Sequence, residues 1–205
     1  MFTRADGKDI DESFTLGETA VSYSFTDEFG FSATCDFFIE VQDNISPTCI
    51  TQNFNISLDD VGQAQIESFM VDNGSFDNCE IVEFSLSKSL FTCEDIGTQE
   101  ITMIISDGTN QSSCTAFITV EDNLAPICEL NETDIWVDEN GEFEVSLNTI
   151  NLSTQDNCQV MDIELIGEED IVCNTFSFFE ISVIVSDQSG NSSECNSIVN
   201  LSWSN

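Results

Sequence analysis

An internal repeat of about 79 residues constrains this chain more than any other feature of its sequence. The segment Val41–Cys49, which reads VQDNISPTC, returns as Val120–Cys128, which reads VEDNLAPIC. Further matches follow in the same order: Asp77–Cys79 with Asp156–Cys158, Cys93 with Cys173, and Ser106–Cys114 with Ser186–Cys195, with an earlier copy of the last run at Thr26–Cys35. Because four cysteine positions recur in order, we expect tandem structural units that stack on their neighbours.

The repeat divides the chain of 205 residues into three parts. Residues 1–42, the front segment, correspond to the back half of a truncated repeat. Residues 43–121 form one complete repeat, the middle repeat. Residues 122–205 form a second, the last repeat, which ends either at a natural terminus or at a cut. We use these names for the sequence ranges throughout.

Alternation of apolar and polar residues predicts β-strands in each part. The runs Cys35–Val41, Cys114–Val120 and Val199–Trp203 are apolar at every second position. Clusters of Asn, Asp, Gly and Ser between such runs, as in Asp72–Ser75 and Ser186–Gly190, are typical of turns. About seven short strands per repeat predict an all-β fold of tandem immunoglobulin-like β-sandwich repeats.

The front segment supplies only the closing strands of a sandwich. Strands are expected near Ala20–Phe25 and Thr34–Val41, with a further one around Ser13–Leu16. So few strands are marginally stable alone, and a free edge invites pairing. We therefore expect the segment to be poorly ordered, packed on the middle repeat, or completed by a strand from a neighbouring copy. Truncation is the favoured explanation.

The charge balance excludes two classes of partner. The sequence holds 39 Asp and Glu residues against 3 Lys and Arg residues, a formal net charge of -36. Binding to nucleic acid or to an anionic membrane surface depends on Lys and Arg, so neither is expected. Membrane insertion is not expected either, because no run approaches 18 apolar residues. So many carboxylates repel one another unless cations gather among them.

The side chains argue against catalysis and for an oxidising compartment. The chain has no His, so Ser-His and Cys-His nucleophiles cannot form, and we expect no enzyme. The nine cysteines lack C-x-x-C spacing and His partners, which argues against zinc. They indicate disulfide bonds, and hence a secreted, extracellular or cell-surface protein. Since Met1–Arg4 begins no signal peptide, the chain is expected to be a fragment of a longer secreted protein.

At this point the chain resembles a known kind of repeat. The run Leu16–Asp27, followed by Gly30, Cys35–Asp43 and Pro47, resembles the back half of a hyalin-type (HYR-like) repeat, and Ile96–Pro126 and Phe176–Leu201 are similar. Four-cysteine versions with a Val-x-Asp-Asn-x-x-Pro link resemble the tandem arrays of large surface adhesins of gliding bacteria. The resemblance implies a secreted, extended adhesive stalk without catalysis.

Chain topology predicts four disulfides, since cysteine spacing alone cannot fix the pairing. The first strand of the middle repeat starts at Cys49 and its last strand starts at Cys114, so both lie at the same end and pair. Cys79 would then pair with Cys93 and close a loop of about 15 residues. The same reasoning pairs Cys128 with Cys195 and Cys158 with Cys173. Cys35 is left over, as truncation predicts, although a free or intermolecular thiol is an alternative.

The same topology gathers acidic side chains at the end where each complete repeat begins. The predicted metal ligands are Asp43, Asp72, Asp77 and Asp107 for the middle repeat and Glu121, Asp122, Asp156 and Asp187 for the last, with Asn123 and Asn157 beside them. Loops at the opposite end of the middle repeat add Asp59, Asp60, Glu94 and Asp95. Ca²⁺ prefers six to eight such oxygen ligands. The alternative is a solvated acidic surface in which Asp and Asn only form turns and caps.

Two classes of function remain. The first is a structural and adhesive segment that forms an extended stalk of a cell-surface adhesin. The second is a subunit of a self-assembling extracellular filament, or a glycan-binding module, for which Phe38 and Trp136 are the candidate exposed aromatic residues. The expected partners are neighbouring repeats of the same protein, other copies in a fibre, or a surface glycan or protein.

Overall fold

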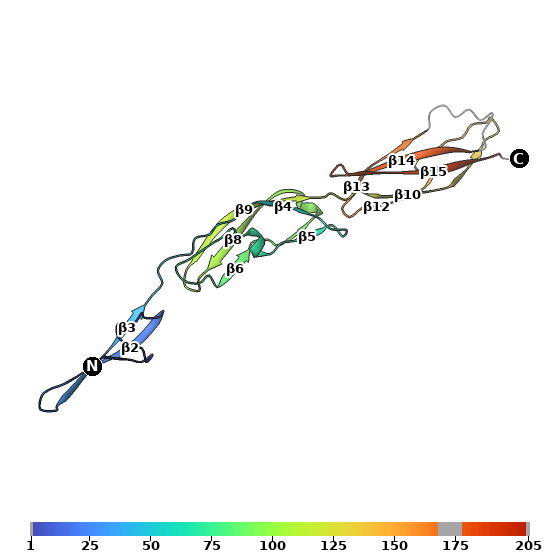
Figure 1. The fold of residues 1–205 in the computed structure, drawn as a ribbon. Coiled ribbons are helices and arrows are strands. Elements are labelled where there is room, and N and C mark those ends of the chain that lie inside the picture. Colours follow the sequence, from blue (N-terminus) through green and yellow to red (C-terminus); the bar gives the residue numbers. More distant parts are fainter. Residues whose placement is uncertain (1, 168–177, 204–205) are drawn as a thin grey trace. The chain divides into compact units, whose positions relative to one another are not determined.

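The structure is a computed structural model that describes residues 2–167 and 178–203 (Figure 1). The strands are β1 (Phe2–Arg4), β2 (Gly17–Thr26), β3 (Ser32–Val41), β4 (Phe54–Ser57), β5 (Gln63–Gln65), β6 (Glu83–Leu86), β7 (Leu90–Thr92), β8 (Gly97–Ser106), β9 (Gln111–Glu121), β10 (Ile127–Asn131), β11 (Thr133–Val137), β12 (Asn151–Gln155), β13 (Val160–Ile166), β14 (Phe178–Asp187) and β15 (Ser192–Trp203). A short helix, α1 (Ser68–Val71), and a 3₁₀ turn, η1 (Cys93–Asp95), interrupt them. The all-β prediction is confirmed.

The chain forms two compact units that alternate along the sequence. Unit 1 contains Met1–Thr51, Asp72–Ser85 and Met103–Cys114, and unit 2 contains Gln52–Val71, Leu86–Thr102 and Thr115–Asn205. Among the described residues, no helix is long and apolar enough to cross a membrane.

Both complete repeats contain a four-stranded sheet with the same connectivity. In the middle repeat the order is β4-β9-β8-β6, with β4 parallel to β9. In the last repeat it is β11-β15-β14-β13, with β11 parallel to β15. A two-stranded sheet, β5-β7 or β10-β12, accompanies each. Two sheets of this kind per repeat define an immunoglobulin-like β-sandwich.

The period-two pattern that predicted the strands also builds the cores. Along β9, Ala116, Ile118 and Val120 are buried, while the residues between them are more exposed. In the last repeat, eight buried side chains form the core: Ile135, Val137, Ile150, Ile181, Val183, Val185, Val199 and Leu201. Successive side chains of a strand point to opposite faces, so one face of each sheet packs inward.

The front segment forms a separate three-stranded sheet, whose strands correspond to three of the four strands of the large sheet in a complete repeat. Its order is β1-β2-β3, all antiparallel, so β3 takes the place that β9 holds in the middle repeat. The strands expected near Ala20–Phe25 and Thr34–Val41 are confirmed as parts of β2 and β3. The strand expected around Ser13–Leu16 is wrong: β1, earlier in the chain, pairs with β2 instead.

Arg4 explains this difference, because its side chain organises the loop that was expected to be a strand. Arg4 is buried, with 6% of the residue exposed. Its guanidinium donates to both carboxylate oxygens of Asp6, at 2.6 and 3.1 Å. It also donates to the backbone carbonyls of Asp9, Glu12 and Ser13. Its carbon Cζ lies 3.8 Å from the centre of the Phe14 ring. A buried arginine thus holds the loop in place of strand pairing.

We expect Arg4→Met to destabilise the front segment by about 2–4 kcal/mol, because it removes the guanidinium hydrogen bonds to Asp6 and to three backbone carbonyls. Hydrogen exchange of residues 2–26, followed by mass spectrometry, should show lost protection in β1 and β2. Lys8→Met is the matched control, since Lys8 is an exposed cation of the same loop. Unchanged exchange in Arg4→Met would show that the arginine is not what organises the loop.

Candidate functional site

Two disulfides lie within the complete repeats. Cys49 bonds to Cys114 and Cys128 bonds to Cys195, as chain topology predicted. Cys49, just before β4, is thus joined to β9, and Cys128, in β10, is joined to β15. Each bond fastens the start of its repeat to the repeat's last strand.

The third disulfide corrects the predicted pairing, because Cys93 of the middle repeat bonds to Cys158 of the last repeat. The predicted pairs Cys79–Cys93 and Cys158–Cys173 are therefore wrong, and Cys173 itself lies outside the described residues. We call the observed bond the staple. Among the described cysteines, Cys35 and Cys79 are free thiols.

Strand geometry explains why Cys79 and Cys93 do not pair. Shortly after Cys79, Val82 donates its N–H to the carbonyl of Ser106, at the end of β8. Cys93 instead lies just before Gly97, at the start of β8. A strand of ten residues spans about 30 Å, whereas a disulfide needs Cα atoms within about 7 Å.

The last repeat gathers three carboxylates where it begins. Asp122 follows β9, Asp156 follows β12 and Asp187 ends β14, and one oxygen from each lies within 4.8 Å of the others. Asp122 is 5% exposed and Asp187 is 4% exposed. The two ion pairs found among the described residues, Arg4–Asp6 and Lys88–Asp95, involve none of them. Buried negative charges without a cationic partner are costly, and these three carboxylates are close enough together to ligate one metal ion.

Two oxygens of this cluster and one of the neighbouring Asn157 are buried and have no hydrogen-bond partner. The unpartnered atoms are Asp122 Oδ2, Asp156 Oδ1 and Asn157 Oδ1. The second oxygen of each carboxylate holds its own loop: Asp122 Oδ1 accepts from the Leu124 N–H, and Asp156 Oδ2 accepts from the Cys158 N–H. Asp122 and Asp156 thus fix their loops and each keep one oxygen available, whereas both oxygens of Asp187 accept from Asn191. We call Asp122, Asp156 and Asp187 the last cluster.

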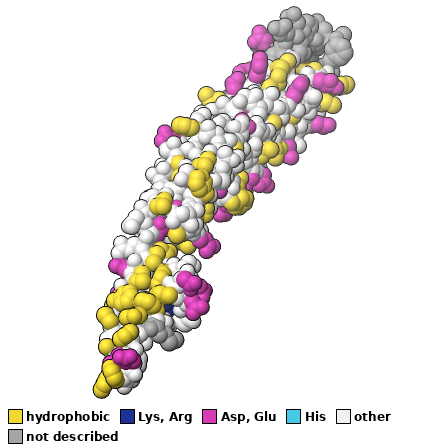
Figure 2. All heavy atoms as spheres, turned by 60° about the vertical axis from the view of Figure 1, so that its left-hand side comes forward, with side chains coloured by type: hydrophobic (Ala, Val, Ile, Leu, Met, Phe, Trp, Pro, Cys, Tyr) yellow, Lys and Arg dark blue, Asp and Glu magenta, His cyan; other side chains and the backbone are white. Residues whose placement is uncertain are grey.

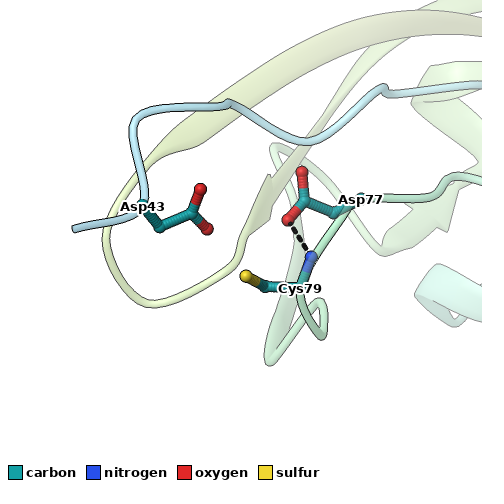
Figure 3. Close-up of side chains that lie close together, drawn as sticks. All are labelled: Asp43, Asp77 and Cys79. Carbon is teal, nitrogen blue, oxygen red and sulfur yellow. Dashed lines mark hydrogen bonds between the residues drawn. The ribbon is translucent and has the colours of Figure 1, made fainter. Parts of the chain in front are cut away.

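A corresponding group of the middle repeat consists of Asp43, Asp77 and Cys79 (Figure 3). We call it the middle cluster. Asp77 Oδ2 accepts from the Cys79 N–H at 2.8 Å, and Asp77 Oδ1 has no partner. The hydrogen bond with the Asp43 carboxylate, together with burial and the surrounding carboxylates, raises the pKa of the Cys79 thiol to about 11. The same contact, with bonds from the Ile45 N–H and from Asn78, lowers the pKa of Asp43.

The other predicted ligands lie outside these clusters. Asp72 accepts from the N–H groups of Gly74 and Ser75. Asp107 accepts from the N–H groups of Asn110 and Thr109, and these bonds lower its pKa. Glu121 accepts from the side chains of Asn55 and Asn123. These acids act as turn formers or local acceptors, as the alternative interpretation proposed for Asp and Asn.

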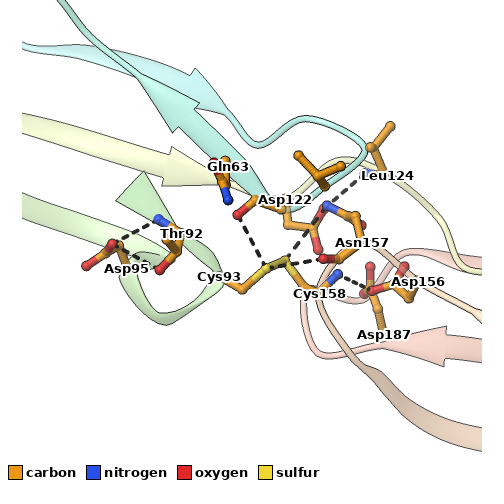
Figure 4. The surroundings of a disulfide bond; sticks show 12 residues. Gln63, Thr92, Cys93, Asp95, Asp122, Leu124, Asp156, Asn157, Cys158 and Asp187 are labelled. Atoms are coloured by element: carbon orange, nitrogen blue, oxygen red, sulfur yellow. Dashed lines mark hydrogen bonds between the residues drawn. A yellow bond between two sulfur atoms is a disulfide. The ribbon is translucent and has the colours of Figure 1, made fainter. Parts of the chain in front are cut away.

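The staple lies beside the last cluster (Figure 4). Asn157 donates through Nδ2 to Asp122 Oδ1 and to the backbone carbonyl of Asp59, at 3.1 Å each. Its own carbonyl oxygen lies 3.6 Å from Cys93 Sγ. Gly62, whose φ is +72°, fits here because a Cβ would lie 2.5 Å from that carbonyl oxygen and 2.6 Å from Cys93 Sγ. The turn Asp59–Gly62 of the middle repeat therefore packs directly on Asn157, which lies between the last cluster and the staple.

No protein-family model matches the sequence, and no curated protein matches it. Solved structures that are similar to it include multi-domain cadherin segments. For Drosophila N-cadherin EC1-4 the identity is 15% and the TM-score 0.43, over 94% of this chain and 59% of that one. For human protocadherin-24 EC1-2 the values are 14% and 0.38, over 78% and 100%. For mouse cadherin-23 EC22-24 they are 16% and 0.34, over 91% and 74%.

The chain spans less than two thirds of the length of the N-cadherin segment. The class of protein that the fold and the disulfides define is a tandem array of immunoglobulin-like β-sandwich repeats.

Proposed function

We propose that this chain is a segment of an extracellular adhesive stalk, built of hyalin-type repeats and stiffened by calcium where one repeat follows another. The observation that carries the proposal is the last cluster: a buried acidic group with unpartnered oxygens at the start of one repeat, beside a disulfide to the repeat before it. Both features serve to hold successive repeats in one arrangement.

The disulfides and the charge support an extracellular location. Disulfides persist in oxidising compartments and are rare in the cytosol, and three of them are present among the described residues. A net charge of -36 favours an environment that supplies divalent cations. Extracellular calcium modules bind in the range of about 10⁻⁴ to 10⁻³ M.

Calcium would be held by the carboxylates of the last cluster together with Oδ1 of Asn157. The cation would supply the positive charge that these buried oxygens lack. Asp122 stands in the short segment between β9 and β10, so fixing its side chain restrains the link between the repeats. Asp156 and Asp187 belong to the body of the last repeat, which gives the link a firm anchor.

Titration calorimetry with calcium chloride tests this function. We expect binding in the sub-millimolar to millimolar range, and binding at least about tenfold weaker in Asp122→Asn, because an amide neither carries the charge nor offers two equivalent oxygens. Asp72→Asn is the matched control, since Asp72 lies outside both clusters and its amide oxygen can still accept the shorter turn hydrogen bond, from the Ser75 N–H. Equal affinity in all three proteins, or no binding heat, would contradict the proposal.

A second candidate function, a filament subunit, is favoured by the front segment. Tyr23, Phe25 and Phe37 share one face of β2 and β3 and are exposed, and Figure 2 shows hydrophobic side chains gathered at this part of the chain. Among the described residues no strand pairs with the outer edge of β3. Self-association in sedimentation velocity would favour the filament, and a monomer at all concentrations would favour the stalk.

A further inference from the structure

Asn157 links the staple to the last cluster. It lies between Asp156 and Cys158, and its side-chain nitrogen binds a cluster carboxylate on one side and the Asp59 carbonyl of the middle repeat on the other. Its Oδ1 is one of the unpartnered oxygens. The staple thus holds the middle repeat against a residue that can itself be a cation ligand.

The middle cluster shows the same motif without a staple. The triplet Asp77–Cys79 repeats the triplet Asp156–Cys158, and its local hydrogen bonds are the same: the cysteine N–H binds the aspartate, at 2.8 and 3.0 Å. In both copies the asparagine side chain also donates to the aspartate that precedes the repeat's first strand. Asn78 donates to Asp43 at 3.3 Å, and Asn157 donates to Asp122 at 3.1 Å. The backbone of the motif is therefore built alike whether or not its cysteine is bonded.

The two copies differ in the third group of the cluster. In the middle cluster that group is the thiol of Cys79, whereas in the last cluster it is the carboxylate of Asp187. Cys158, whose sulfur bonds to Cys93, is not a member of the last cluster. A sulfur ligand suits softer metals, while three carboxylates suit calcium. Bonding the cysteine thus accompanies a change to an oxygen-only ligand set.

The position that would staple the middle cluster carries a different residue. β8 begins at Gly97 and β2 begins at Gly17, so Cys93, four residues before Gly97, corresponds to Ser13. Cys79 is accordingly a free thiol. The chain therefore contains one stapled and one unstapled copy of the same acidic motif.

We infer that the staple and the calcium site of the last cluster are coupled, so that the Cys93–Cys158 bond strengthens calcium binding and bound calcium protects the bond from reduction. This inference rests on the proposed function. Reduction by a dithiol breaks the S–S bond, and the dithiol supplies two electrons and two protons, giving two cysteine thiols and one cyclic disulfide. The factor by which the bond changes calcium affinity equals the factor by which calcium shifts this redox equilibrium.

Two measurements test the coupling on the whole chain. By calorimetry, we expect Cys93→Ser to bind calcium about tenfold more weakly than the unaltered chain. Cys35→Ser is the matched control, because Cys35 is exposed and outside both clusters. In the unaltered chain, mixtures of reduced and oxidised dithiothreitol should need an about tenfold higher ratio of reduced reagent to half-reduce Cys93–Cys158 in calcium than in a chelator. Peptide mapping reads the bond, with Cys49–Cys114 as the internal reference.

The redox measurement needs no substitution, so it stands even where Cys93→Ser does not fold. Equal affinity in Cys93→Ser and an unshifted redox equilibrium, with calcium still bound, would overturn the coupling and leave the calcium stalk intact. Absence of calcium binding in the unaltered chain would overturn the proposed function, and this inference with it.

Discussion

Gly62→Ala is expected to lower the free energy of unfolding by about 2–5 kcal/mol. A left-handed conformation costs a residue with a side chain about 1–2 kcal/mol, and overpacking against fixed atoms adds about 1–3 kcal/mol. The obstacle is the Asn157 carbonyl, 2.5 Å from the new Cβ, which is backbone and cannot turn aside. The Cys93 sulfur at 2.6 Å is held by its disulfide. Urea unfolding followed by circular dichroism measures the change.

The last repeat offers a matched control for this substitution. Gly141 has a φ of +81° and closes the corresponding turn, with its N–H donating to Asp138 as that of Gly62 donates to Asp59. A Cβ at Gly141 meets no atom within 4 Å. Gly141→Ala should therefore show only the conformational cost of about 1–2 kcal/mol. Equal losses in the two variants would mean that the Asn157 carbonyl and the Cys93 sulfur do not obstruct a Cβ at position 62.

Most strands were open to prediction because they depend on local pattern. Alternation along Cys114–Val120 requires no knowledge of distant residues, and it corresponds to the buried face of β9. β1 was not open to prediction, because its place depends on Arg4 reaching carbonyls as far along the chain as Ser13. The available signal was that Arg4 is one of three cationic residues in a strongly acidic chain.

The staple could not be recognised from cysteine spacing. Cys93–Cys158 and Cys49–Cys114 have the same separation of 65 residues, although one bond joins two repeats and the other lies inside one. Only the assignment of each cysteine to one end of a strand separates the two cases. Cys93 stands just before β8 and Cys79 stands close to where β8 ends, which excludes the short loop that seemed natural from the sequence.

The candidate metal ligands divide for a similar reason. Asp122, Asp156 and Asp187 follow or end strands that meet at one edge of the repeat, so topology alone brings them together. The sequence also predicts Asp72 at the corresponding end of the middle repeat, but its carboxylate accepts hydrogen bonds from its own loop. Composition cannot distinguish an aspartate that forms a turn from one that faces a cluster, because both tasks use the same oxygen atoms.

Chelation of calcium is expected to lower the melting temperature of the last repeat by roughly 10–20 °C. A ligand present at 100 times its dissociation constant stabilises the folded state by about 2.7 kcal/mol. For a domain of this size, each 1 kcal/mol shifts the melting temperature by about 4–8 °C. Differential scanning calorimetry in calcium at about 100 times the dissociation constant obtained by titration calorimetry, and again in excess chelator, measures the shift.

Two variants that each remove one negative charge, at different positions, decide whether this shift is due to the last cluster. Asp122→Asn should keep about half of the shift or less, because binding that is tenfold weaker leaves about 1.4 kcal/mol of stabilisation at the same calcium concentration. Asp72→Asn should keep the full shift. Magnesium should replace calcium poorly, since it demands a smaller octahedral site and releases its water reluctantly. If chelation leaves the melting curve of the unaltered chain unchanged, the last cluster binds no calcium, and the last repeat is held to the middle one by the staple and the Asn157–Asp59 hydrogen bond.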